Sequence, residues 1–320
     1  MHALLYIVAI LLGMSSATAG TKHKICQSPV SSAAAAGCTE PLNDPAQTSE
    51  QRVEDLASRR KENPQKFAYI IGNEDRIEFP NDRKGKYAAT GLLDCDDSGG
   101  TAQGPLSQTA QITYRADIIT TAGHMFYHKK ECDRNTKLVC IFIVNVGGKV
   151  TREPVRMDTV QTGGCPDQDR RQDWATARLQ SALKNITPYA LPPAKYILND
   201  GTETVFVSQF SLNFERNGRY PPTIQTCKIR RVLTPDKFVP IQQDCDTGKG
   251  SSGGAHLVTI NNSLIAVAIN VGQFDFWNQK NEEWNIKNSN EFDNNIMYNV
   301  SVAISGAFRK SIIEQSKSKQ

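Results

Sequence analysis

The feature that most constrains the fold is a long succession of short strand-like segments that starts near residue 67 and fills most of the chain. These segments are rich in Val, Ile, Thr and Phe, and Gly, Asn, Asp and Pro separate them. Tight turns are marked by Asp200-Gly201 and by Asn261-Asn262-Ser263. Because no helices alternate with the strands, the pattern predicts an all-β fold, an antiparallel sandwich or barrel rather than a parallel sheet.

Two helices are expected at the borders of this region. Residues 48–63, "TSEQRVEDLASRRKEN", open with a capping box that pairs Thr48 with Gln51. Residues 20–47, which precede this helix, are rich in Ala, Ser, Pro and Gln and show no periodicity. The second helix is predicted over 299–315, and its apolar side chains would dock on a barrel; they are Val302, Phe308, Ile312 and Ile313.

The size and the charge of the chain exclude some classes of partner. Its 320 residues can form one large or two ordinary domains with an ample core. A net charge of +4, spread evenly, is too small to indicate nucleic-acid binding. Short basic clusters such as Arg230-Arg231 are typical of solvated surface, so we expect no nucleic-acid partner.

The first residues have the pattern of a secretory signal. "ALLYIVAILLG" at 3–13 is an apolar run of signal-peptide length, and Ala17-Thr18-Ala19 supplies an A-x-A cleavage site. We therefore expect a signal peptide at 1–19 and a soluble mature protein that is secreted or periplasmic, with an uncleaved anchor as the alternative. No later segment has the roughly 20 apolar residues that span a bilayer, so no membrane contact is expected after cleavage.

Eight cysteines fit an oxidising compartment, in which they would form four disulfide bonds. No C-x-x-C motif occurs, which leaves zinc ribbons and thioredoxin-type redox sites unsupported. Sequence alone allows about 105 connectivities, and proximity along the chain favours one of them. The expected pairs are Cys132–Cys140, Cys227–Cys245, Cys26–Cys38 and Cys95–Cys165.

Three stretches contain residues that could act together on a substrate. "IITTAGHMF" is an apolar strand that leads through small residues to His124, and "QDWATARL" starts a strand at Asp173. The third is the run "GSSGG" at 250–254. A His can take the proton of a Ser hydroxyl, a carboxylate can orient that His, and a glycine turn can present backbone N–H groups to an oxyanion. Each stretch alone is typical of a turn or loop, and only the combination predicts chemistry.

In this order, "TTAGH", "DWATARL" and "GSSGG" resemble the three signature stretches of the chymotrypsin-like (trypsin-fold) serine peptidases, and the intervals between them match as well. Residues 69–93 are similar to the opening of the glutamyl-endopeptidase-like branch, which is mostly bacterial. The resemblance covers about 70–308. It implies two six-stranded antiparallel β-barrels, at about 70–180 and 188–299, with an active site in the cleft between them.

The resemblance implies a role for each motif residue. His124 would be the general base, Asp173 the carboxylate that orients it, and Ser252 the nucleophile. The backbone N–H groups of Gly250 and Ser252 would form the oxyanion hole. Ser251 is the rival nucleophile, but the family pattern Gly-x-Ser-Gly-Gly fits only with Ser252 in third place.

Other candidate residues fit this chemistry less well. His128 and His256 have no small-residue strand leading to them, and Asp167 and Asp169 lie in a turn. His124 and His128 form an i, i+4 pair that could bind a metal on a helix, but no carboxylate motif completes it. We expect neither a metal nor a cofactor.

Two positions depart from the family pattern. Many members have Asp directly before the nucleophile, where it pairs with a newly cut N-terminus. Ser251 occupies that place here, although "IIGN" at 70–73 looks like such a terminus. Many members also have Cys directly after the catalytic His, where this chain has Met125, so the disulfide framework of trypsin does not transfer.

The resemblance places a specificity pocket between residues 246–249 and 270–272. Asp246 lies six residues before Ser252, where trypsin-like enzymes have the carboxylate that receives Arg or Lys, so cleavage after Arg or Lys is expected. The alternative is the glutamyl-specific branch, which also has "DT" here but uses a pocket His that residues 206–243 lack. The expected substrate contacts are Asp246, Thr247, Asn270, Val271 and Gly272.

These features predict an exported serine endopeptidase that hydrolyses polypeptides through an acyl-enzyme, as a monomer and without a cofactor. Residues 20–69 would be an N-terminal extension or a propeptide, and 309–320 a C-terminal tail whose last five residues, 316–320, fray. Two alternatives stay open. The fold could be kept as a catalytically idle binding or adhesion module, or the same triad could hydrolyse esters.

Overall fold

The computed structural model describes residues 71, 74–79, 85–97, 106–127, 132–146, 148–166, 169–211, 214, 221–233, 241–275, 292 and 297–317. All of them belong to one compact unit, Leu42–Gln320. The predicted signal peptide, the predicted helix at 48–63 and the predicted Cys26–Cys38 bond lie outside the described residues. Within the described part of the chain, no helix has both the length and the apolar character needed to cross a bilayer.

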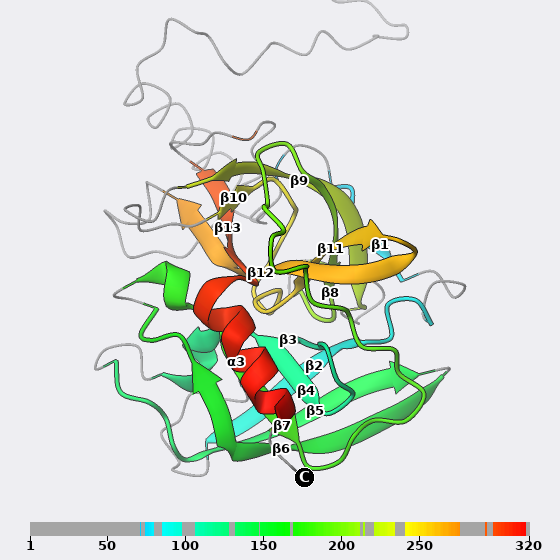
Figure 1. Ribbon diagram of the computed structural model, residues 1–320, viewed down its shortest axis with the longest axis vertical. Coiled ribbons are helices and arrows are strands. Elements are labelled where there is room, and N and C mark those ends of the chain that lie inside the picture. The colour runs from blue at the N-terminus through cyan, green and yellow to red at the C-terminus, as the bar shows by residue number, and fades with distance from the viewer. Residues whose placement is uncertain are drawn as a thin grey trace, which may run out of the picture. The chain divides into compact units, whose positions relative to one another are not determined.

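Six antiparallel strands close into a first barrel in the order β2-β3-β4-β7-β6-β5, drawn in cyan to green in Figure 1. Side chains that point into it, such as Leu93, Ile119 and Phe142, are fully buried. The strands are β2 (Thr90–Asp97), β3 (Leu106–Ile112), β4 (Ile118–Thr121), β5 (Leu138–Val146), β6 (Lys149–Thr162) and β7 (Ala175–Leu179).

A second ring of six antiparallel strands follows the order β9-β10-β13-β12-β11-β8 and closes because β8 also pairs with β9. The prediction of two six-stranded antiparallel barrels is therefore confirmed. The strands are β8 (Glu203–Ser208), β9 (Thr223–Val232), β10 (Ile241–Gln243), β11 (Ala255–Ile260), β12 (Ser263–Asp275) and β13 (Met297–Ala303).

Local sequence explains why these segments form strands and turns. Along β9, exposed Thr226, Lys228 and Arg230 alternate with buried Cys227 and Ile229, which is the period of a strand with one face in a core. The predicted turn between β11 and β12 is present, and Asn261 and Asn262 adopt φ values of 48° and 60°. Asn tolerates this left-handed conformation better than most residues, so the tight hairpin is encoded locally.

The N-terminal border of the first barrel differs from the prediction. We expected residues from about 70 onward to begin that barrel. Instead β1 (Ile77–Glu78) pairs with β9 of the second barrel, and the first barrel starts at β2. Pairing partners of so short a strand depend on tertiary contacts, which no local pattern reveals.

The C-terminal helix begins later and ends later than predicted. Residues 299–303 belong to β13, and α3 extends from Gly306 to Lys317, so the predicted tail is helical for most of its length. Phe308 and Ile312 are buried as expected, and α3 lies against β7 and β4 of the first barrel (Figure 1). The Phe308 ring stacks on Trp174 at 4.9 Å between centroids, which joins the chain's end to the first barrel.

The disulfide pairs were predicted correctly in one case and wrongly in two. Cys227–Cys245 is present. Cys95 bonds to Cys140, and Cys132 bonds to Cys165. The prediction used proximity along the chain, whereas Cys95 and Cys140 are direct neighbours across β2 and β5, 45 residues apart in sequence.

Candidate active site

His124 is held at the end of β4 by a short turn. The strand ends at Thr121, and the 3₁₀ turn η2 (Gly123–Phe126) follows it. The buried Gln108 side chain donates from Nε2 to Thr121 Oγ1 at 2.8 Å and to the Ala122 carbonyl oxygen at 3.0 Å. These bonds supply a donor to two buried oxygen atoms at the end of the strand, and they fix the backbone that carries His124.

A steric contact explains why the residue before His124, Gly123, has no side chain. A Cβ atom at Gly123 would lie 2.9 Å from the carbonyl oxygen and 3.0 Å from the nitrogen of Trp174. Real Cβ atoms are not found this close to backbone atoms, so only glycine allows the two chain segments to touch. This contact brings His124 beside the residue that precedes Trp174, which is Asp173.

Asp173 and His124 are joined by hydrogen bonds. Asp173 lies between the 3₁₀ turn η3 (Arg170–Gln172) and β7, and it is 1% exposed. Its Oδ2 lies 2.9 Å from His124 Nδ1, and its Oδ1 accepts the His124 backbone N–H at 2.7 Å. The buried carboxylate therefore places the proton on Nδ1 and leaves the lone pair on Nε2. The imidazole is partly open to solvent, with a side chain 38% exposed.

The Gly-Ser turn from the second barrel packs against the first barrel near His124. Gly250 and Gly253 adopt φ values of 98° and 82°, which strain any other residue. The Thr109 N–H of β3 lies 3.0 Å from the carbonyl oxygens of both Gly250 and Ser252. A Cβ atom at Gly253 would overlap the Thr109 carbonyl and lie 3.1 Å from the Ala122 nitrogen. The turn that carries Ser252 thus touches the strand end that carries His124.

The two serines of the turn have different surroundings. Ser251 is 1% exposed, and its hydroxyl accepts the Gly248 N–H at 3.1 Å. Ser252 is partly exposed. Ser251 is therefore used inside the turn, whereas Ser252 can meet a substrate. Among the described residues no hydrogen bond joins the Ser252 hydroxyl to His124, and in ligand-free proteins such bonds are often long.

The proposed oxyanion donors also differ from their neighbours. The N–H groups of Ser251, Gly253 and Gly254 each donate to a backbone carbonyl. Within the described residues the N–H groups of Gly250 and Ser252 have no protein acceptor. Two unpaired backbone donors in one turn are the groups that an oxyanion needs.

Asp246 does not occupy the position expected for a substrate receptor. It is 1% exposed, and it accepts the Ile71 N–H at 2.8 Å and the Asp75 N–H at 3.3 Å. Burial raises the pKa of its carboxyl to about 8. The sequence had suggested that a substrate Arg or Lys would meet this group. The N-terminal segment covers it instead, and this contact between distant parts of the chain left no local signal.

The other predicted pocket residues lie close to the turn but are mostly buried. The Asn270 carbonyl accepts the Gly253 N–H at 2.6 Å, and the Asn270 N–H donates to the Gly254 carbonyl at 2.8 Å. Val271 is buried, and Gly272 is partly exposed. The Asn270 backbone therefore lies beside the turn that carries Ser252.

Thr247 is buried and its hydroxyl donates to Asn299 Oδ1 at 2.9 Å. Thr247 therefore links the segment before the Gly-Ser turn to β13.

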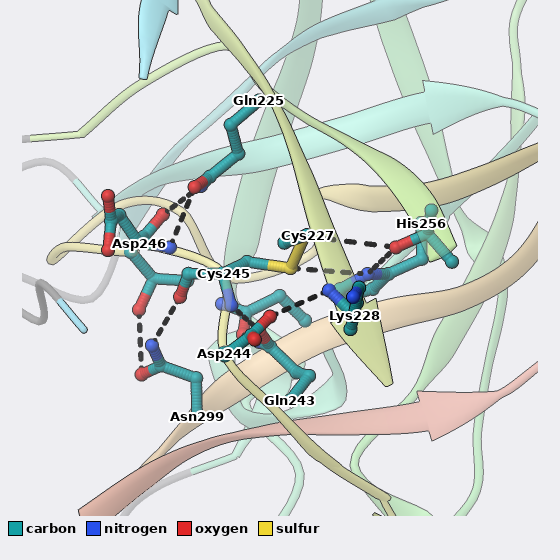
Figure 2. The surroundings of a disulfide bond; sticks show 12 residues. Gln225, Cys227, Lys228, Gln243, Asp244, Cys245, Asp246, His256 and Asn299 are labelled. Carbon is teal, nitrogen blue, oxygen red and sulfur yellow. Dashed lines mark hydrogen bonds between the residues drawn. A yellow bond between two sulfur atoms is a disulfide. The ribbon is translucent and has the colours of Figure 1, made fainter. Parts of the chain in front are cut away.

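A second histidine near this region, His256, has a structural role. His256 is fully buried beside the Cys227–Cys245 bond, as Figure 2 shows. Its Nε2 lies 2.8 Å from Ser301 Oγ and its Nδ1 3.2 Å from Thr204 Oγ1, and burial lowers its pKa to about 3. Cys227, Cys245 and His256 are close enough to share a metal, but the disulfide leaves no thiolate to bind one.

Two contributors were missed by sequence reasoning. Gln108 fixes the strand end before His124, and Arg170 of η3 brings a positive charge to Gly272 on β12. Arg170 stands three residues before Asp173 in a doublet with Arg171. The doublet was visible in the sequence, but which of the two arginines is paired elsewhere was not.

Comparisons with known proteins support the fold. A scan against models of protein families finds no match, and a search of curated proteins finds none. A Glu endopeptidase structure is similar with a TM-score of 0.54 at 15% identity, over 78% of this chain and 100% of its own. The protease Anisep from Arthrobacter nicotinovorans is similar with a TM-score of 0.53 at 12% identity, over 77% of this chain and 100% of its own. At these identities the likeness shows that the chain has the chymotrypsin-like double-barrel fold of such serine peptidases.

Proposed function

We propose that the chain is a serine endopeptidase that cleaves polypeptides through an acyl-enzyme, with Ser252 as nucleophile, His124 as general base and Asp173 as the orienting carboxylate. The observation that carries the proposal is the buried Asp173 held against His124 Nδ1, with the Gly-Ser turn packed against the same strand end. This arrangement combines the three functional groups of acyl transfer on one fold that serine peptidases also use.

In the first step, Ser252 Oγ forms a bond to the carbonyl carbon of the scissile peptide, and His124 Nε2 takes the hydroxyl proton. The negative charge moves to the carbonyl oxygen, where the N–H groups of Gly250 and Ser252 donate to it. Asp173 stabilises the imidazolium that has formed. When the C–N bond breaks, His124 returns its proton to the leaving amine, and an ester on Ser252 remains.

In the second step, water replaces the amine. His124 Nε2 takes a proton from the water as its oxygen attacks the ester carbonyl, and the same two N–H groups bind the new oxyanion. The collapse of this intermediate returns the proton to Ser252 Oγ and releases the acid.

We also propose that the protein acts outside the cytoplasm, secreted or periplasmic. Three disulfide bonds support this location, since such bonds persist mainly in oxidising compartments. Residues 20–69 would then be an extension or a propeptide that precedes the peptidase body. A preference for Arg or Lys is not part of the proposal, because the N-terminal segment covers Asp246.

A phosphonylating active-site probe tests the proposal. We expect the probe to label the wild type, and labelling to vanish in Ser252→Ala. Ser251→Ala is the matched control, because it removes the neighbouring hydroxyl that the turn uses internally. Absence of labelling in correctly folded wild type would indicate a catalytically idle binding module, and labelling of Ser252→Ala would refute the assigned nucleophile.

A further inference from the structure

Arg170 lies beside the expected substrate-binding strand, and its guanidinium has no hydrogen-bonding or ion-pair partner within the described part of the chain. Its Nη1 lies 3.1 Å from the point where a Cβ atom of Gly272 would be. Its charge also acts on Tyr298 of β13, where it partly offsets the rise in pKa that burial causes. The guanidinium therefore extends from the first barrel to the second, over the strands β12 and β13.

Arg171, the next residue in the same turn, differs from Arg170 because its guanidinium is paired with a carboxylate. Arg171 donates from Nη2 to Asp169 Oδ2 at 2.8 Å and from Nε to Asp169 Oδ1 at 2.8 Å. Among the described residues no carboxylate or carbonyl binds the Arg170 guanidinium, although the side chain is half-buried. A partly desolvated cation without a partner has lost part of its hydration without compensation, and a negative ligand would restore it.

The strand beneath Arg170 has one edge that no described strand occupies. β11 pairs with β12 as far as Ile269, and residues 272–275 of β12 pair only with β13 among the described strands. An extended peptide can hydrogen-bond along such an edge. Since the Asn270 backbone is bonded to the Gly-Ser turn, a peptide cleaved at Ser252 would have its cleaved residue near Asn270.

Distance along the strand then separates Arg170 from the cleaved residue. Gly272 is two residues beyond Asn270, which corresponds to about 7 Å of strand. The side chain that reaches Arg170 thus belongs to the second, third or fourth residue before the scissile bond, not to the residue whose carbonyl is attacked.

We propose that Arg170 is a specificity-determining residue that binds a carboxylate side chain of the substrate at the second to fourth position before the scissile bond. This inference rests on the proposed peptidase function. The substrate class is an extended peptide with Asp or Glu in that stretch. Arg170 suits this task because its planar guanidinium can donate two parallel hydrogen bonds to a carboxylate.

The test uses the full-length protein and pairs of peptides that differ only by Glu or Gln at one of the four positions before the cleaved bond. For wild type we expect the Glu peptide to have the higher kcat/KM at one position from the second to the fourth. In Arg170→Gln this ratio should fall about tenfold, since a hydrogen bond to a charged group contributes roughly 1.5–3 kcal/mol and each 1.4 kcal/mol is tenfold.

Arg171→Gln is the matched control, because it removes an adjacent positive charge that Asp169 already neutralises. It should leave the ratio unchanged. Arg170→Glu should invert the preference in favour of Lys at the same position. The ratio in wild type should also decrease as ionic strength rises, because the partly exposed pair is screened by salt.

Labelling of Ser252 by the phosphonylating probe separates this inference from the proposed function. If the protein is labelled and cleaves peptides, but the Glu-to-Gln ratio is near one or is unchanged in Arg170→Gln, the role of Arg170 is refuted while the peptidase stands. A preference confined to the cleaved residue itself would also refute it. If the wild type is not labelled, both proposals fail.

Discussion

The regions around Asp173 in the first barrel and Asp246 in the second contain carboxylates that are equally buried, each 1% exposed. Asp173 faces a histidine that can carry a positive charge. Asp246 faces two backbone N–H groups, and a second carboxyl, that of Asp75, lies close to it. Burial is therefore the same in both regions, and the partner alone decides whether a carboxylate can serve catalysis.

The two carboxylates also differ in how far apart in the sequence their partners lie. Asp173 meets His124 because Gly123 lets two loops of one barrel touch. Asp246 meets Ile71, which lies 175 residues away in sequence. The first contact is made by elements next to each other in a barrel, and the second depends on how an N-terminal segment lies against the other barrel.

The largest effect is expected from Asp173→Asn, which removes the charge but keeps the shape. Turnover should fall by about 10⁴, because the amide holds the histidine in the wrong tautomer. The melting temperature should change little. Turnover on any peptide or ester substrate that the wild type cleaves gives the measurement, and a loss of only a few-fold would mean that another carboxylate orients His124.

A third buried carboxylate, Asp117, extends the comparison because it faces a permanent cation. Arg178 Nη2 lies 2.7 Å from Asp117 Oδ2, and both side chains are almost fully buried. Arg178→Met should destabilise the protein by about 3 kcal/mol, because it removes the closest partner of the buried carboxylate and leaves only the partly exposed Arg115, 3.1 Å away. Urea denaturation measures this free energy of unfolding.

The exposed pair of Arg156 and Asp158 on β6 supplies the control for Arg178→Met. Arg156→Met should cost less than about 1 kcal/mol, because an exposed ion pair contributes little. Similar losses in both variants would show that burial does not separate the two ion pairs.

Gly123→Ala tests the steric link between the loops that carry His124 and Asp173. The new methyl group would push His124 away from Asp173, and misplacement on the order of 1 Å can reduce turnover about 10²-fold. Gly85→Ala is the control, since a Cβ atom there meets nothing within 4 Å. Full activity of Gly123→Ala would show that the contact with Trp174 does not position the histidine.

The smallest effect is expected from Asp246→Asn, and it depends on pH. The pKa of this carboxyl is raised from 3.8 to about 8 in the folded protein, so folding favours the protonated form. Its contribution to stability is present below about pH 4 and is lost as pH rises to about 8. Burial also raises the pKa of the neighbouring Asp75 carboxyl, which acts in the same direction.

Asp246→Asn removes this titration, so the free energy of unfolding should vary less between pH 4 and pH 8 than in wild type. At pH 4 the variant should be less stable than wild type by on the order of 1 kcal/mol, because the amide nitrogen cannot accept the second backbone N–H, and this loss should shrink toward pH 8, where the wild type buries a carboxylate. Urea titrations at both pH values give the comparison. An unchanged pH dependence would mean that Asp246 titrates normally.

The sequence by itself determined the strand-rich character of the chain, the Asn261-Asn262 turn and the three catalytic candidates. These features are local, because strand periodicity, turn conformation and the steric demand for small residues act over a few neighbouring positions. The stretches around His124, Asp173 and Ser252, with their order and spacing, predicted the double barrel by resemblance.

Only the tertiary structure decided which partner each buried group meets. Cys95 bonds to Cys140 because β2 and β5 are neighbours in the barrel, and Asp246 is covered because residues near Ile71 lie over it. Arg170 reaches Gly272 from the other barrel. Pairings between distant segments depend on how strands close into barrels and how the barrels pack, and no short stretch of sequence encodes that packing.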